Sequence, residues 1–143
     1  MKLKILSFWW EAFSSENVVS ATMMTGIWEI TALDNHAPLL TSIKPSTMYV
    51  VYIDDKDIER RDDFAIWTWV VEISNNSVKI MADMLVDIDD LDVSKAERAR
   101  EEALKLMEKY RDSKDKMDME KFIEAEDMLL RSIAQLKLGS TIK

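Results

Sequence analysis

The only histidine of this chain, His36, is the first residue to consider for acid–base chemistry. It lies two residues after Asp34, and a nearby carboxylate can orient an imidazole as a general base. Such catalysis also needs a nucleophile, and no serine motif accompanies the pair. We therefore expect a structural or interface histidine, no catalytic residues, and a chain that is not itself an enzyme.

Aspartates are concentrated between residues 83 and 92, which raises the question of a calcium site. The EF-hand pattern fails, because counting from Asp87 places Asp92 where glycine is required and Arg98 where glutamate is required. We expect no metal site and a solvated acidic link at 85–91. Its negative charge would favour the N-terminus of a following helix.

Composition excludes several further classes of function. The 143 residues carry a formal net charge of −8, which argues against general nucleic-acid binding. The chain has no cysteine, and its two glycines, at 26 and 139, cannot form a phosphate-binding loop. No apolar run approaches the roughly 20 residues that span a bilayer. The basic and apolar start resembles a signal peptide, but Glu11 and Glu16 follow too soon.

Residues 1–84 predict an antiparallel β-sandwich. Short segments that alternate in polarity, or that are rich in β-branched and aromatic residues, are separated by polar turns. The segment Ser74–Ser77 predicts a hairpin turn, because asparagine tolerates positive φ. The segment Asp34–Pro45 holds both prolines and predicts a rigid, partly apolar corner between strand regions. The expected strands lie within 3–8, 17–24, 27–33, 48–53, 64–73 and 78–83.

Residues 92–138 predict an antiparallel two-helix hairpin, which makes the fold class α+β. The apolar period changes from two to between three and four, and the connecting loop is short. Ser94 with Glu97 forms a plausible capping box, Asp92 is a competing cap, and Asp118 can cap the second helix. We expect Gly139 to end that helix, leaving a tail at 139–143. The expected apolar faces are Ala96, Ala99, Ala103, Leu106 and Tyr110, then Phe122, Ala125, Leu129, Ile133 and Leu136.

Several motifs resemble the epsilon subunit of F-type ATP synthase, which is called delta in mitochondria. The segment His36–Thr41 reads His-Ala-Pro-Leu-Leu-Thr and is followed by Lys44-Pro45, as in that family. Segments 64–66, 72–76 and 78–83 are similar to its strand motifs, and Leu91–Ala96 is similar to the motif that opens its first helix. The order of a sandwich followed by a helical hairpin also agrees.

The resemblance implies a non-catalytic central-stalk subunit of a proton-translocating ATP synthase. The sandwich, 1–84, would couple the gamma subunit to the c-ring, and the helices, 92–138, would regulate ATP hydrolysis at the alpha/beta catalytic head. Arg131, Lys137 and Lys143 would contact that head. The implied gamma and c-ring interface consists of Glu29, Asn35, His36, Ala37, Pro38, Leu39 and Leu40.

The implied location is peripheral, on the cytoplasmic face of a bacterial inner membrane, or on an organellar inner or thylakoid membrane in a eukaryote. Membrane contact would come only through the complex. Some bacterial epsilon subunits bind ATP on the folded hairpin, and the matching positions here are Asp92, Lys95, Arg98 and Arg131. Lys95 replaces an arginine of that motif and cannot form the same phosphate fork. ATP is therefore at most a regulatory ligand, and no other cofactor is implied.

The chain departs from the family in its scarcity of glycine. Thr68 and Trp69 replace a Gly-Gly pair, and Trp28, Thr31 and Asn35 stand where glycines are expected. Asparagine can still supply positive φ at one of these positions. The loss of glycines leaves open a stand-alone adaptor or scaffold without a rotor partner, which should lack an exposed apolar patch near His36.

The adjacent tryptophans Trp9 and Trp10 are candidates for a partner contact. If both lie in a strand, one must face outward, where a tryptophan favours binding to another protein. The alternative is a tryptophan tucked beneath the helical hairpin. A pocket lined by tryptophan that also contained His36 would revive an enzymatic interpretation.

Overall fold

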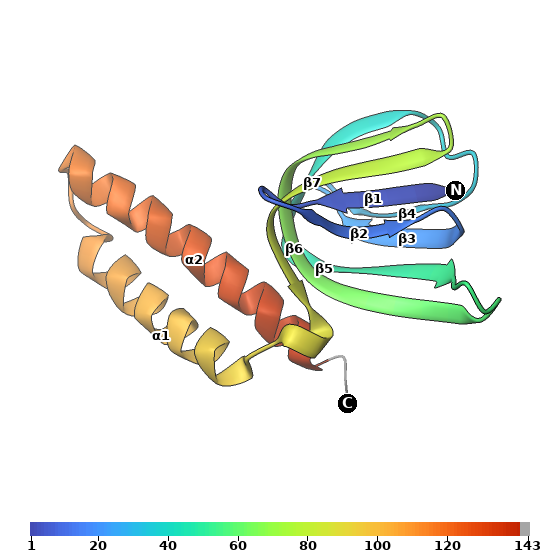
Figure 1. Ribbon diagram of the computed structural model, residues 1–143. Coiled ribbons are helices and arrows are strands. Elements are labelled where there is room, and N and C mark those ends of the chain that lie inside the picture. The colour runs from blue at the N-terminus through green and yellow to red at the C-terminus, as the bar shows by residue number, and fades with distance from the viewer. Residues whose placement is uncertain (141–143) are drawn as a thin grey trace.

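The computed structural model describes residues 1–140, with only the backbone at Trp69. Seven strands are followed by a 3-10 helix, η1, and by two helices that extend away from the sheet (Figure 1). The elements are β1 (Lys2–Leu6), β2 (Glu11–Ser15), β3 (Val18–Met24), β4 (Glu29–Ala32), β5 (Leu39–Ile53), β6 (Glu59–Ser74), β7 (Ser77–Asp87), η1 (Ile88–Asp90), α1 (Val93–Tyr110) and α2 (Lys116–Ser140). Lys143 and the rest of 141–143 lie outside the described residues.

The predicted β-sandwich is confirmed, and it is built from one continuous sheet in the order β2-β1-β7-β6-β5-β3-β4. The long strands β5, β6 and β7 carry register shifts and bend, so the sheet folds over a common core (Figure 1). One pair departs from the antiparallel prediction, because β1 runs parallel to β7. The core includes Leu3, Ile5, Met23, Ile43, Val50, Ile66 and Ile80, all fully buried.

The predicted corner at Asp34–Pro45 is wrong in its second half. The chain turns at Asn35, which has φ of 61°, and β5 already begins at Leu39 and continues through Pro45. The register of β5 shifts between Ile43 and Ser46, and a bulge is where a strand tolerates a residue without an N–H.

The predicted turn at Ser74–Ser77 is confirmed. Asn75 and Asn76 have φ of 51° and 56°, as the twist of a two-residue hairpin requires. Residues 85–88, which were expected in an acidic link, instead complete β7 and begin η1. Leu85 packs against the sandwich core, and Val86 and Ile88 are partly buried beside the hairpin.

The helices begin at aspartate caps, although not at every predicted residue. Asp92 caps α1, since its carboxylate accepts from the Lys95 N–H at 3.0 Å, so Ser94 lies inside the helix. For α2 the prediction of Asp118 is wrong. Asp115 accepts from the Met117 N–H at 3.0 Å, whereas Asp118 accepts from the Ser113 hydroxyl at 2.8 Å.

Gly139 does not end α2, which continues to Ser140. A side chain added there would approach Leu91 Cδ2 to 3.1 Å and Val93 Cγ2 to 3.3 Å. The glycine therefore gives room for the start of α1 to pack against the end of α2. No helix in the described part of the chain combines the length and apolar character needed to cross a membrane.

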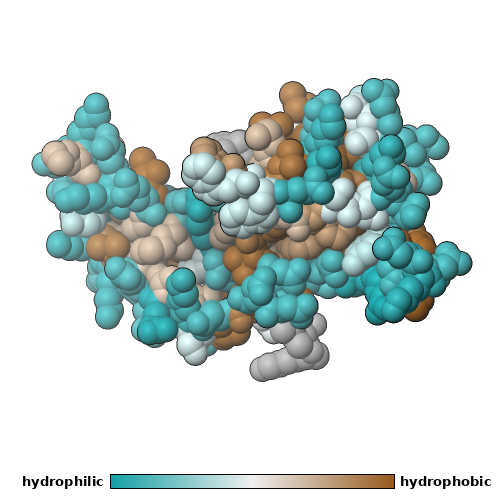
Figure 2. Space-filling model, in the orientation of Figure 1, coloured by the Kyte–Doolittle hydropathy of each residue, from teal (hydrophilic) through white to brown (hydrophobic). Residues whose placement is uncertain are grey.

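The hairpin prediction is confirmed, with one error on its apolar face. Ala96, Ala103 and Ala125 are buried between the helices, but Ile133 is exposed. Instead, Ala134 and Leu138 are buried against Ala65 and Met84 of the sheet, together with Trp67 and Val86. The buried side of α2 changes along its length because α2 packs on α1 and then on the sheet. Much of the outer surface of the hairpin is hydrophilic (Figure 2).

Candidate functional site

The motif loop, residues 34–40, lies at the end of the sandwich remote from the helical hairpin. Backbone geometry fixes it there: the N–H of Asn35 donates to Asn76 Oδ1 at 2.8 Å, which joins the loop to the β6–β7 turn. Asp34 Oδ1 accepts from the Met1 amino nitrogen at 2.6 Å, and this contact holds the pKa of Asp34 below its ordinary value. The predicted positive φ at Asn35 is therefore part of a braced turn.

His36 is held by its own loop. Its N–H donates to the Leu33 carbonyl at 3.0 Å, and its Nδ1 lies 2.7 Å from the Ala37 carbonyl oxygen. A neutral imidazole that donates from Nδ1 to this carbonyl is oriented without a carboxylate partner. The arrangement offers positioning rather than a nucleophile–base pair, and His36 does not line the pocket that Trp9 and Trp10 line.

The motif loop, together with Leu33 just before it, presents an apolar edge to solvent. Leu40 is 73% exposed and Leu33 is 53% exposed, with exposed Ala37 and Pro38 between them in sequence. Leu39 is partly buried and packs against the core, which anchors the edge. An apolar edge on a rigid turn is a surface suited to a protein contact.

Glu29 does not join this edge. It begins β4, where it pairs with Met24, while the far end of β4 leads into the motif loop. The structure therefore brings together six of the seven residues implied for the rotor interface and separates the seventh by the length of a strand.

The residues implied for nucleotide sensing are also partly assembled. Asp92, Lys95 and Arg131 line one hollow between α1, α2 and the end of β7. Arg98 does not line it, and its Nε lies 3.4 Å from the Ser94 carbonyl oxygen. Lys137 is exposed in the last turns of α2.

Arg131 is the residue that joins the hairpin to the sandwich by charge. Its Nη2 donates to Asp83 Oδ2 on β7 at 2.7 Å, and its Nε lies 2.8 Å from Asp127 Oδ2 one turn earlier on α2. Its guanidinium also stacks over the ring of Trp67 on β6, 4.2 Å from the centroid. We name Arg131, Asp83 and Trp67 the latch.

The sequence did not indicate the latch, because Asp83 and Trp67 lie on strands that are far from Arg131 in the sequence. The exposed tryptophans were predicted in part. Trp9 and Trp10 are both exposed, because residues 7–10 form a turn between β1 and β2 rather than a strand.

Comparison with known proteins gives a consistent family. Residues 1–88 match the family model described as the ATP synthase delta/epsilon chain, β-sandwich domain. The ATP synthase epsilon chain of Ligilactobacillus salivarius is 32% identical over 115 residues, which cover 80% of this chain and 78% of the relative. That of Bordetella parapertussis is 33% identical, with 77% and 74% covered.

The likeness also includes the helical part. The epsilon chain of Stenotrophomonas maltophilia strain K279a is 27% identical and covers all of this chain and 97% of its own length. A chain from the cryo-EM structure of the Euglena gracilis mitochondrial ATP synthase superposes with a TM-score of 0.75 at 20% identity, covering 99% of this chain and 80% of that one. At this identity the likeness concerns the fold.

Proposed function

This chain belongs to the ATP synthase delta/epsilon family, and we propose that it couples the gamma subunit to the c-ring in the central stalk. As a member of this family it is a non-catalytic component of ATP synthase. The proposal assigns the coupling to the sandwich and places the subunit peripherally, on the cytoplasmic face of its membrane, through its partners alone.

The motif loop is the observation that carries the proposal. It presents exposed Leu40, and Leu33 just before it is exposed as well, on a turn braced by the hydrogen bond between Asn35 and Asn76. A rigid apolar edge binds without a large cost of ordering, which suits a contact that must transmit torque. The same edge argues against a stand-alone scaffold, which has no need of it.

The hairpin is proposed as the regulatory element, acting against the alpha/beta head. The latch supports a docked state, because Arg131 gains an ion pair with Asp83 and a stacking contact with Trp67. The ion pair is partly exposed, so it contributes only about 0.2–1 kcal/mol. A hairpin held by the latch and by a small apolar contact of Ala134 and Leu138 with the sheet can leave the sandwich and return, as a switch requires.

Nucleotide binding would compete with the latch. The hollow beside α1 contains Lys95 and Arg131, but Arg131 already contacts Asp83 and Asp127. A phosphate group would have to displace both carboxylates before it could bind the guanidinium of Arg131. We therefore propose the latch, rather than ATP, as the main determinant of the docked hairpin, with ATP at most an additional ligand.

The test of the coupling role is binding to the purified gamma subunit from the same organism, measured by size-exclusion chromatography and calorimetry. We expect a one-to-one complex that Leu40→Asp weakens at least tenfold. That loss corresponds to about 1.4 kcal/mol, the scale of one interface hot spot. The matched control is Ile58→Asp, which places the same charge on an exposed apolar residue of the β5–β6 turn.

Equal weakening by both variants, or an unchanged affinity with Leu40→Asp, would contradict the assignment of the motif loop. A chain that remains monomeric beside gamma would favour the adaptor hypothesis. Circular dichroism of both variants establishes that the sandwich is folded before the affinities are compared.

A further inference from the structure

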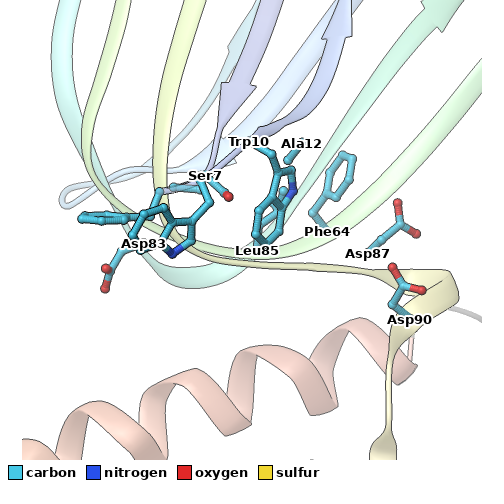
Figure 3. A pocket seen from close by; sticks show the side chains of 11 residues that line it. Ser7, Trp10, Ala12, Phe64, Asp83, Leu85, Asp87 and Asp90 are labelled. Atoms are coloured by element: carbon cyan, nitrogen blue, oxygen red, sulfur yellow. The ribbon is translucent and has the colours of Figure 1, made fainter.

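A pocket of a different kind lies at the hairpin end of the sandwich (Figure 3). Its walls come from the β1–β2 turn, from Phe64 on β6 and from Leu85 on β7, with Trp10 beside them. Asp87 and Asp90 lie together at one end of it, near the start of the hairpin. Apolar and aromatic surface thus meets two carboxylates in one hollow, which we name the aromatic–acidic pocket.

The aromatic wall is exposed and held in shape. Phe8, Trp9 and Trp10 are 85%, 82% and 63% exposed. The N–H of Ser7 donates to the Trp10 carbonyl at 2.9 Å, which closes the turn, and Phe8 packs edge-on against Trp9 with centroids 5.0 Å apart. Three consecutive large aromatic side chains displayed by a closed turn form a hot-spot surface rather than scattered apolar exposure.

The acidic end of the pocket has no cation of its own. Among residues 1–140, no lysine or arginine lies within ion-pair distance of Asp87 or Asp90, whereas Asp83 at the other end is paired with Arg131. The negative field reaches Asp62, whose pKa is raised by burial and then by Asp87 and Asp89. Asp87 uses one oxygen to accept from the Asp89 N–H at 2.9 Å, which fixes the carboxylate in place.

We propose that the aromatic–acidic pocket binds an arginine- or lysine-bearing segment of a protein partner, with the cation between Trp10 and the two carboxylates. A cation is attracted to the negative face of a tryptophan ring, and a nearby carboxylate adds to the attraction. Apolar residues flanking the cation would cover Phe8 and Trp9. The pocket lies at the opposite end of the sandwich from the motif loop, so this inference does not rest on the proposed coupling role.

Charge complementarity selects this occupant over two others. A second copy of the chain also carries a net charge of −8, so two acidic pockets would repel each other. An anionic lipid surface would likewise be repelled by Asp87 and Asp90, although tryptophans favour membrane interfaces. A basic protein segment satisfies both the aromatic wall and the acidic end.

The test uses the full chain, ¹⁵N-labelled at the tryptophan indoles, and a probe peptide of alternating leucine and arginine. A peptide with glutamine in place of each arginine is the uncharged comparison. We expect the indole signals of Trp9 and Trp10 to shift and that of Trp28 to stay. The affinity should fall at least fivefold with Trp10→Ala, and as much with Asp87→Asn and Asp90→Asn combined, since asparagine retains the hydrogen bond to residue 89.

Two matched controls keep the test specific. Trp28→Ala removes a tryptophan that is 62% exposed, and Asp55→Asn with Asp57→Asn removes two charges from the β5–β6 turn. Neither should change the affinity by more than twofold. Equal binding of the glutamine peptide, unmoved Trp9 and Trp10 indoles, or equal losses in the controls would each overturn the proposal. Trp10-dependent self-association in sedimentation, or Trp10-dependent binding to phosphatidylcholine vesicles without peptide binding, would overturn it in favour of another occupant.

Discussion

Thr68 shows how a single side chain supports the bend of the sheet. It is fully buried where the β6–β7 register shifts, and the family resemblance places a glycine there. Its hydroxyl donates to the Met81 carbonyl and accepts from the Val70 N–H at 3.1 Å. The side chain thus satisfies two backbone groups that the bulge removes from the regular ladder.

We predict that Thr68→Val destabilises the sandwich by about 1–3 kcal/mol, because valine keeps the shape but leaves both backbone groups unpaired. Thr68→Ser keeps the hydroxyl and should cost less. Urea unfolding of the three proteins measures the difference. A valine variant as stable as the serine variant would mean that the two hydrogen bonds contribute little.

Asp62 gives the molecule a pH dependence of stability. Its carboxylate accepts from the Tyr52 hydroxyl at 3.2 Å, but burial, and the charges of Asp87 and Asp89, raise its pKa above the ordinary value of 3.8. The folded state therefore favours the protonated form. The stability that this group contributes is complete below pH 3.8 and is lost as pH rises through the raised folded pKa.

We predict that Asp62→Asn is more stable than the parent at pH 7, by less than about 1 kcal/mol because the group is partly exposed. The advantage should shrink as pH falls toward 4, since the parent then gains its proton. Urea unfolding between pH 4 and pH 7 measures it. The exposed control Asp55→Asn removes the same charge, and an identical profile there would show that only net charge matters.

At the scale of elements, sequence patterns predicted the sandwich, the turn at Asn75–Asn76 and the helical hairpin. Periodicity sufficed for the sandwich and the hairpin because each strand or helix buries one regular face, and the pair of asparagines indicated the turn. The predicted pattern of burial was wrong where one helix packs on two different elements. Ile133 is exposed because α2 changes partner from α1 to the sheet. Gly139 is helical and lies against Leu91 and Val93, where a larger residue would be too close. The parallel β1–β7 pair is equally invisible locally, since it joins segments about 75 residues apart.

The candidate site was likewise only partly predictable from the sequence. The motif loop could be predicted from a contiguous segment, because a turn with proline and asparagine is specified locally. The latch and the aromatic–acidic pocket could not be predicted in this way. The latch combines residues of two strands and α2, and the pocket combines residues of the β1–β2 turn, β6, β7 and η1. The adjacent tryptophans and the aspartate cluster were noted separately in the sequence, but nothing local showed that they share one pocket.

The latch makes the docking of α2 sensitive to one side chain. We predict that Arg131→Gln weakens docking by about 1–2 kcal/mol, the sum of a partly exposed ion pair and a cation–π contact. Amide hydrogen exchange in the second half of α2 should then speed up roughly five- to thirtyfold. Arg131→Lys keeps the charge but loses the planar stack, so its exchange rate should lie between those of the parent and of Arg131→Gln.

A double-mutant cycle with Asp83→Asn separates the ion pair from the stack. If the Asp83–Arg131 ion pair stabilises docking, the double variant should lose no more docking free energy than Arg131→Gln alone, because the single variant already removes the ion pair. Strictly additive losses would show that the 2.7 Å contact carries no coupling and that Trp67 holds the arginine.

At the scale of the whole molecule, the two ends of the sandwich meet different parts of the chain. The motif loop is joined to the start of β7 through Asn76, whereas α2 packs on Met84 near its far end. These two points on β7 are separated by up to roughly 26 Å, at about 3.3 Å per residue. The hairpin can therefore move without disturbing the braced turn at the other end.

This separation predicts the behaviour of a chain cut after Asp90. The remaining sandwich should bind gamma with unchanged affinity, because the motif loop and the hairpin lie toward opposite ends of β7. It should melt at a lower temperature, because Ala65, Met84 and Trp67 lose the cover of Ala134 and Leu138.

In the reconstituted ATP synthase, replacing the full chain by the sandwich should raise ATP hydrolysis while rotation-coupled synthesis persists. A cut chain that suppresses hydrolysis as well as the full chain would remove the regulatory role from the hairpin. A folded cut chain that no longer binds gamma would instead place part of the rotor interface on α1 or α2.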